Sequence, residues 1–179
     1  MSVFLGWMPD QPAQACLGAL VEELQAAMPP DAPAHAWRNP QQWHVTLRFL
    51  GDSASPEERA RISRALDTAM HGVAAFDAGI AALQYWPGAR VLVATLASSP
   101  AMDQLLVAAE TCARSCGYAA EKRAPRPHIT LAYLRERLPV SRLPALPDPP
   151  TDSLRFEAAH LLRTIPLGYR SWHRTALLS

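Results

Sequence analysis

Two short segments of the sequence carry a histidine, a threonine and a leucine at the same spacing. His44 and Thr46 lie in QQWHVTLRFLGD, and His128 and Thr130 lie in PRPHITLAYLR. An imidazole titrates at about pH 6.5, so one histidine can act as a base while the other acts as an acid near neutrality. A hydroxyl group two residues along can donate a hydrogen bond to a phosphate oxygen. The paired motifs therefore predict acid–base chemistry on a phosphoester, with no need for a metal, a cofactor or a covalent intermediate.

Both motifs lie where apolar residues alternate with polar ones, a pattern typical of half-buried β-strands. In the first strand, alternation places three polar side chains on one face: His44, Thr46 and Arg48. In the second strand, the corresponding face carries Arg126, His128 and Thr130. The opposite faces are expected to enter a core beneath helices, and they carry Val45, Leu47 and Phe49 in the first strand and Ile129, Leu131 and Tyr133 in the second. If the two strands lie side by side, both sets of polar groups converge on one cleft.

The rest of the chain predicts the elements that hold these strands. Helices are expected over residues 10–30, 53–72 and 99–117, and further strands over residues 2–8, 76–86, 89–96, 154–165 and 169–178. Asp10 and Ser55 are expected to cap the first two helices, and Pro29 and Pro30 to end the first. This order predicts an α+β fold with helices packed outside largely antiparallel sheets. The two passages from a helix to a motif strand indicate an internal pseudo-repeat.

Composition limits the class of protein. Apolar residues make up 49% and charged residues 18% of the 179 residues, which is typical of a soluble globular chain. No apolar run approaches the roughly 20 residues of a membrane helix, and the first residues lack the basic segment of a signal peptide, so a cytoplasmic location without membrane contact is expected. The net charge of +1 argues against binding a long duplex but permits binding of one phosphate or one RNA end. We expect a monomer with no obligate protein partner.

The remaining cysteines and histidines give weaker signals. The cysteines are expected to be small buried hydrophobic residues: Cys16, Cys112 and Cys116. His71 falls at a helix C-terminus and is interpreted as structural. His160 and His173 lie in the closing strands and are candidates to line a cleft. A zinc site that uses both motif histidines is disfavoured, because threonine is a poor zinc ligand and neither motif holds a cysteine or a carboxylate.

The paired motifs resemble those of the 2H phosphoesterase superfamily. Within it, the chain looks most like the RNA 2′,3′-cyclic phosphodiesterases, also called 2′-5′ RNA ligases. The resemblance runs along the whole chain, through VFLGWMPD, WRNPQQWHVTLRFLG, RAPRPHITLAYL and LLRTIPLGYRSWHRTALL. It implies a single domain over residues 1–179, built from two pseudo-repeated lobes. Each lobe would have an antiparallel sheet with flanking helices, and the two would enclose a central cleft that holds both motifs.

The resemblance also implies an activity, the hydrolysis of a 2′,3′-cyclic phosphate at an RNA end to a 2′-phosphomonoester. His44 would be the proton donor to the departing 3′ oxygen, and His128 the proton acceptor that activates water. Thr46 and Thr130 would hold the phosphate. The reverse reaction would join RNA ends through a 2′-5′ linkage.

Two positions depart from the family pattern. Tyr133 stands where the family usually has a basic residue after the second motif, and Thr164 stands where it often has serine. Arg126 or Arg135 is a candidate to compensate for the first change. The side chains expected to bind substrate are Arg48, Arg126, Tyr133 and Tyr169. Two alternatives stay open: a cyclic phosphodiesterase acting on a small nucleotide or on an ADP-ribose cyclic phosphate, and an RNA-end-binding module without turnover.

Overall fold

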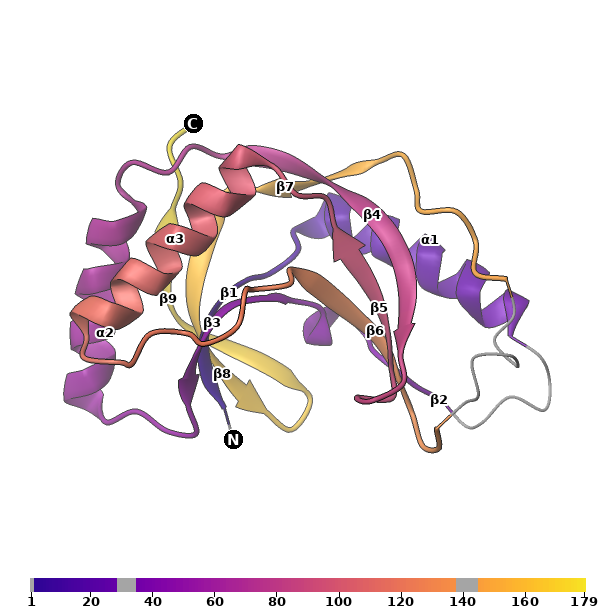
Figure 1. Ribbon diagram of the computed structural model, residues 1–179, viewed down its shortest axis with the longest axis horizontal. Helices are drawn as coiled ribbons and strands as arrows, with labels where there is room; N and C mark the ends of the chain where they lie inside the picture. Colours follow the sequence, from indigo (N-terminus) through magenta and orange to yellow (C-terminus); the bar gives the residue numbers. More distant parts are fainter. Residues whose placement is uncertain (1, 29–34, 138–144) are drawn as a thin grey trace.

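The computed structural model describes residues 2–28, 35–137 and 145–179 (Figure 1). Its helices are α1 (Gln11–Ala27), α2 (Pro56–Met70) and α3 (Pro100–Ser115), with a short 3-10 helix η1 (Pro40–Gln42). Its strands are β1 (Val3–Trp7), β2 (His35–Trp37), β3 (Val45–Gly51), β4 (Phe76–Trp86), β5 (Val91–Leu96), β6 (His128–Leu134), β7 (Ser153–Phe156), β8 (Ala158–Ile165) and β9 (Gly168–Ala176). The three helices and both motif strands confirm the expectations from sequence. Strand β2 was not expected, and the strand expected over 154–165 is divided into β7 and β8.

The helices begin where their capping residues predict. The Asp10 carboxylate accepts a hydrogen bond from the Ala13 backbone N–H at the start of α1. Ser55 and Glu58 form a capping box at the start of α2, which satisfies two backbone donors that would otherwise lack partners. Pro29 and Pro30, expected to end the first helix, lie outside the described residues.

The strands form one curled antiparallel sheet of nine strands, which confirms the α+β fold class. Eight of them follow the order β7-β4-β5-β6-β3-β1-β8-β9, and β2 pairs with β6. The sheet has two halves, which meet where β3 and β6 share a single residue pair, and the division of the domain into two pseudo-repeated lobes stays a prediction. Helices α2 and α3 lie outside the half that contains β3, whereas α1 lies beside the other half (Figure 1). The two motif strands are therefore neighbours at the middle of the sheet.

Apolar side chains between the sheet and the helices form the core. Trp7 and Trp43 are almost completely buried, and the Trp7 ring stacks on Phe156 with the ring centroids 4.3 Å apart. Phe4 is buried as well. Within the described part of the chain, no helix is both long enough and apolar enough to cross a bilayer.

Candidate active site

The pairing of β3 with β6 brings the two motifs together. Val45 and Ile129 are Cα partners in this antiparallel pair, and both are fully buried. Successive residues of a strand point to opposite faces, so the residues on either side of these two point away from the core. Those residues are His44, Thr46, His128 and Thr130. In an antiparallel register, each histidine then lies across from the threonine of the other motif.

The His44 ring is held in a defined tautomer. Its Nδ1 lies 3.2 Å from the backbone oxygen of Gln42, which can only accept, so Nδ1 carries the proton and Nε2 is left for the cleft. The pKa of His44 is lowered to about 4, chiefly by burial and also by the positive charges of His128 and Arg38, while the bond to Gln42 partly opposes this shift. At neutral pH the ring is therefore an uncharged imidazole.

The His128 ring has the same arrangement at the other motif. Its Nδ1 lies 2.6 Å from the backbone oxygen of Arg126 and so donates to it. The Trp86 ring packs against the imidazole with the ring centroids 4.5 Å apart, and the Arg126 guanidinium lies 4.6 Å from the centroid of Trp86. Both motif histidines thus turn Nδ1 to a carbonyl two residues upstream and keep Nε2 for chemistry.

Two aromatic rings pack against the His44 imidazole. The ring centroid of Tyr169 lies 4.2 Å from that of His44, and the centroid of Phe4 lies 5.1 Å away. Phe4 and Tyr169 also meet edge to face at 5.4 Å, a favourable aromatic geometry. Tyr169, a predicted substrate-binding residue, therefore lies within the site.

Arg38 supplies a positive charge beside this cluster. Its guanidinium lies 5.4 Å from the centre of the Tyr133 ring and donates a hydrogen bond to Tyr169. Its backbone N–H bonds the Leu131 carbonyl oxygen at 2.8 Å and so joins the end of β2 to β6. Sequence reasoning missed Arg38 because its segment has no periodicity that indicates a strand. It also missed Trp86, because an aromatic residue at the end of a strand is ordinary and does not by itself indicate a site.

A β-bulge in β3 changes the side to which later residues point. In the pairing with β1, Gly6 lies opposite Thr46 and Leu5 lies opposite Arg48, so Leu47 is an extra residue. A bulge of this kind shifts the alternation of the strand by one position. The expectation that Arg48 shares a face with the motif residues is wrong for this reason.

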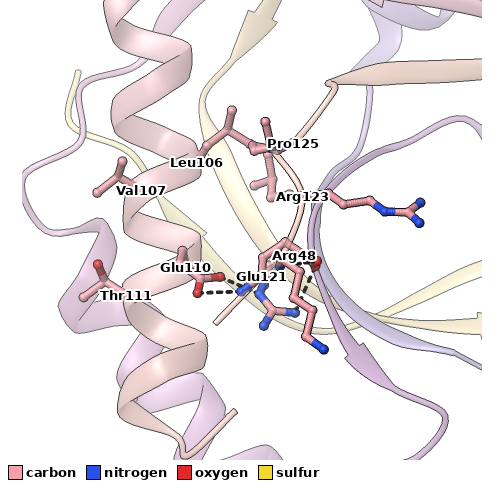
Figure 2. Close-up of a pocket in the computed structure, with 11 residues that line it drawn as sticks. Arg48, Leu106, Val107, Glu110, Thr111, Glu121, Arg123 and Pro125 are labelled. Atoms are coloured by element: carbon pink, nitrogen blue, oxygen red, sulfur yellow. Dashed lines mark hydrogen bonds and ion pairs between the residues drawn. The ribbon is translucent and has the colours of Figure 1, made fainter. Parts of the chain in front are cut away.

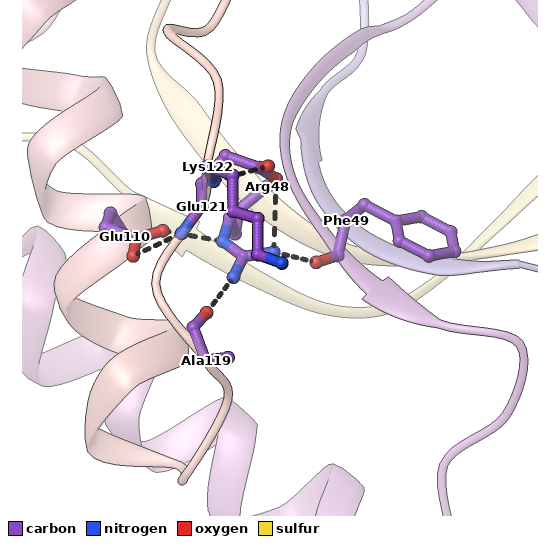
Figure 3. Close-up of polar contacts among 6 residues, drawn as sticks. All are labelled: Arg48, Phe49, Glu110, Ala119, Glu121 and Lys122. Atoms are coloured by element: carbon purple, nitrogen blue, oxygen red, sulfur yellow. Dashed lines mark hydrogen bonds and ion pairs between the residues drawn. The ribbon is translucent and has the colours of Figure 1, made fainter.

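Arg48 instead lies against α3, where it joins several elements. Its Nε lies 2.6 Å from a Glu110 oxygen, and one guanidinium nitrogen lies 3.6 Å from Glu121. It also donates to the backbone oxygens of Ala119 and Phe49. Burial raises the pKa of Glu110, but the hydrogen bonds from Arg48 and from the Glu121 backbone outweigh burial and leave that pKa below its ordinary value. Figure 3 shows Arg48 and the Phe49 ring on opposite sides of the strand.

A cavity of about 390 Å³ lies on the α3 side of β3. Figure 2 shows it between α3 and the segment before β6, with Arg48, Glu110 and Arg123 among its lining residues. The motif histidines lie on the other face of β3. Arg48 therefore belongs to the wall of this cavity.

The remaining histidines divide between the two faces of the sheet. His160 on β8 is a partner of Gly6, which is also a partner of Thr46, so His160 lies on the cleft face two strands away from Thr46. Burial lowers the pKa of His160 to about 4. His173 bonds Asp67 of α2 at 2.7 Å and so faces the helices, which leaves His160 as the one of these two candidates on the cleft face. Among the described residues, no cluster of three acidic, histidine or cysteine side chains could hold a metal ion.

One known family and several solved structures are similar to this chain over most of its length. A family model described as the 2′-5′ RNA ligase superfamily matches residues 8–165. The structure of E. coli LigT complexed with 3′-AMP has a TM-score of 0.77 and 22% identity, over 99% of this chain and 98% of that one. A Thermus thermophilus protein has a TM-score of 0.73 and 23% identity over the same shares. The MHV ns2 PDE domain has a TM-score of 0.53 and 14% identity, over 98% and 97%. No curated protein sequence matches the chain.

Proposed function

Because this chain belongs to the 2′-5′ RNA ligase superfamily, we propose that it hydrolyses 2′,3′-cyclic phosphates at RNA ends to 2′-phosphomonoesters. The observation that carries the proposal is the pairing of Val45 with Ile129, which directs the histidine and threonine of both motifs to one face. A phosphoryl transfer needs a base for the attacking oxygen, an acid for the leaving oxygen, and donors for the charged oxygens. The two imidazoles and two hydroxyls are groups of these kinds.

The proposed reaction assigns one step to each histidine. The His128 Nε2 takes a proton from a water molecule as the water oxygen forms a bond to phosphorus. The bond from phosphorus to the 3′ oxygen breaks, and the protonated His44 Nε2 gives its proton to that oxygen. The ester at the 2′ oxygen stays intact, so the product carries a 2′-phosphate and a free 3′ hydroxyl. Thr46 and Thr130 donate hydrogen bonds to the phosphate oxygens during the transfer.

The acid role of His44 depends on the substrate. Its low pKa keeps the ring uncharged in the free protein near neutrality. An anionic phosphate beside the ring favours the charged form and raises the pKa, since an opposite charge at close range stabilises imidazolium. Binding of the substrate therefore supplies the charge that the acid needs.

Nucleotide complexes of a structurally similar protein support the substrate class. E. coli LigT has been solved with 3′-AMP, with phosphate and with ATP. A fold of this shape therefore accepts a nucleotide phosphate. In this chain, the Arg38 and Arg126 guanidinium groups lie beside the rings that contact the two histidines and supply positive charge for such a ligand.

The test is hydrolysis of a nucleoside 2′,3′-cyclic phosphate by the purified chain in the presence of a chelator. We expect the 2′-monophosphate as product, and a loss of at least about 100-fold in kcat for His44→Ala and for His128→Ala, the range for removal of a general acid or base. His71→Ala, at the C-terminal end of α2, is the matched control. Full activity in either motif variant would disprove the mechanism, and tight binding without turnover would favour the non-catalytic alternative.

A further inference from the structure

A smaller cavity lies on the helix side of the sheet, away from the motif histidines. It has a volume of about 230 Å³ and is lined by Val3, Asp52, Ser53, Ala54, Arg59, Arg163 and Trp172. Val3 belongs to the buried core and is the Cα partner of Arg163, so both side chains point to the helix side. Phe4, the next residue of β1, contacts His44 on the opposite face. The sheet therefore separates this cavity from the candidate active site.

Two guanidinium groups converge on one indole ring in this cavity. The Arg59 Cζ atom lies 4.6 Å from the centroid of the Trp172 ring, and the Arg163 Cζ atom lies 5.7 Å from it. Arg59 comes from α2 and Arg163 from β8, so the ring gathers like charges from two elements. Arg170 is the Cα partner of Arg163 on β9 and adds a third positive charge on this side of the sheet. Like charges at close range repel, and an anion bound among them removes that cost.

The Arg59 side chain keeps hydrogen-bonding capacity for such an anion. Its Nε is buried and has no hydrogen-bond partner, and it forms no ion pair with any residue of the described ranges. Contact with Trp172 attracts the charge, but an indole offers no acceptor to the guanidinium N–H groups. The lining holds one carboxylate, that of Asp52, against two guanidinium groups, so the charge of the cavity is positive.

We propose that this cavity is a second anion site, which binds a phosphate group through Arg59 and Arg163 with the Ser53 hydroxyl as a further donor. Arginine suits this ligand because its planar fork can donate two parallel hydrogen bonds to phosphate oxygens. A volume of about 230 Å³ is below the roughly 300–1,000 Å³ of sites for larger ligands, which favours a single phosphate group. The group is either inorganic phosphate or one phosphate of a nucleotide whose remainder lies outside the cavity. Binding here is independent of the proposed hydrolysis.

The test follows tryptophan indole N–H signals of the ¹⁵N-labelled chain by NMR. Inorganic phosphate, adenosine 5′-monophosphate and sodium chloride are added in separate titrations at equal ionic strength, and chloride controls for screening. Trp172→Phe assigns the signal of the cavity, and Trp86→Phe assigns a signal beside His128 that reports the candidate active site. We expect a saturable shift of the Trp172 signal with phosphate or the nucleotide, and none with chloride. The tighter of the two probes identifies the source of the phosphate group.

Substitution of the two arginines separates the two sites. Arg59→Gln and Arg163→Gln should each weaken the Kd reported by Trp172 about tenfold or more, because a charge-assisted contact is lost, and should leave the Kd reported by Trp86 unchanged. Arg64→Gln, at an exposed position of α2, is the matched control and should change neither. The proposal is overturned if the wild-type Trp172 signal shows no saturable shift with either probe, or if chloride reproduces the shift. Equal Kd values in wild type and both arginine variants would also overturn it.

Discussion

The Arg48 guanidinium lies 2.6 Å from the Glu110 carboxylate and so ties the first motif strand to α3. Only 10% of the Arg48 side chain is exposed, and its other nitrogens bond the backbone oxygens of the neighbouring Phe49 and of Ala119 in the segment after α3. The ion pair is therefore mostly shielded from solvent, in contrast to the exposed pair of Arg155 with Asp77. This contact supports the strand from the face opposite the cleft.

Arg48→Ala is expected to lower the free energy of unfolding by about 1.5–3 kcal/mol, because several hydrogen bonds that involve charged groups are lost together. Arg155→Ala, the matched control at an exposed pair, should cost less than about 1 kcal/mol. Urea unfolding of both variants measures the difference. Equal losses would show that the Arg48 contacts do not stabilise the fold.

Acid is expected to destabilise the protein through its buried histidines. The pKa values of His44 and His160 are about 4 in the folded chain, against an ordinary value of 6.5. Because the folded pKa is depressed, each ring stabilises the fold fully above about pH 6.5, and this stability is lost as the pH falls towards 4. Between pH 7 and pH 5, we expect wild type to lose about 4 kcal/mol more than a double variant with asparagine at both positions, about 2 kcal/mol for each ring. Equal slopes of the unfolding free energy against pH in wild type and in the double variant would contradict this.

Much of the site follows from the sequence, because it depends on local periodicity. The alternation around His44 and His128 holds as far as the threonine of each motif, and the capping residues place the helices. The alternation fails after Leu47, where a bulge turns Arg48 to α3 and Phe49 to the cleft. A bulge depends on how a strand pairs with neighbours far away in sequence, so a local pattern does not predict it. Arg38 was missed for a similar reason, since its position depends on the pairing of β2 with β6.

Proton uptake should accompany phosphate binding if His44 is the acid. The ring is uncharged near neutrality in the free protein, and an anion in the cleft raises its pKa. At pH 6.5, titration with a nucleoside 2′-monophosphate in buffers of different ionisation enthalpy should show uptake of a fraction of a proton per site. His44→Asn should remove most of that uptake, whereas His173→Asn, on the α2 side of the sheet, should not. Unchanged uptake in His44→Asn would assign the proton to another group.

Arg38→Ala should weaken phosphate binding and change the pH profile together. The guanidinium lowers the pKa of His44 through its charge. In a plot of kcat/KM against pH, its removal should therefore move the limb that reports His44 to higher pH. We expect KM for a cyclic nucleotide to rise about tenfold, since a charge-assisted contact to phosphate is lost. Arg38→Lys keeps the charge and should keep the position of the limb. A rise in KM without any shift of the limb would assign Arg38 a purely structural role beside Tyr133 and Tyr169.

Gly6 of β1 lies between Thr46 of β3 and His160 of β8, since it is the Cα partner of both. The close packing around Gly6 should not tolerate a larger residue. A Cβ at Gly6 would lie 2.8 Å from the Val45 carbonyl oxygen, which belongs to the backbone that pairs the two motif strands. Gly6→Ala is therefore expected to displace β3, to destabilise the fold by about 1–3 kcal/mol and to lower kcat for a cyclic nucleotide. Gly18→Ala in α1 meets nothing within 4 Å and should stabilise the protein by about 0.5–1 kcal/mol, because alanine favours a helix interior over glycine. Thermal unfolding and kcat are measured on both variants, so that a loss specific to the junction of β1 and β3 is separated from the general effect of an added methyl group. A Gly6→Ala variant with wild-type stability and turnover would refute the close packing.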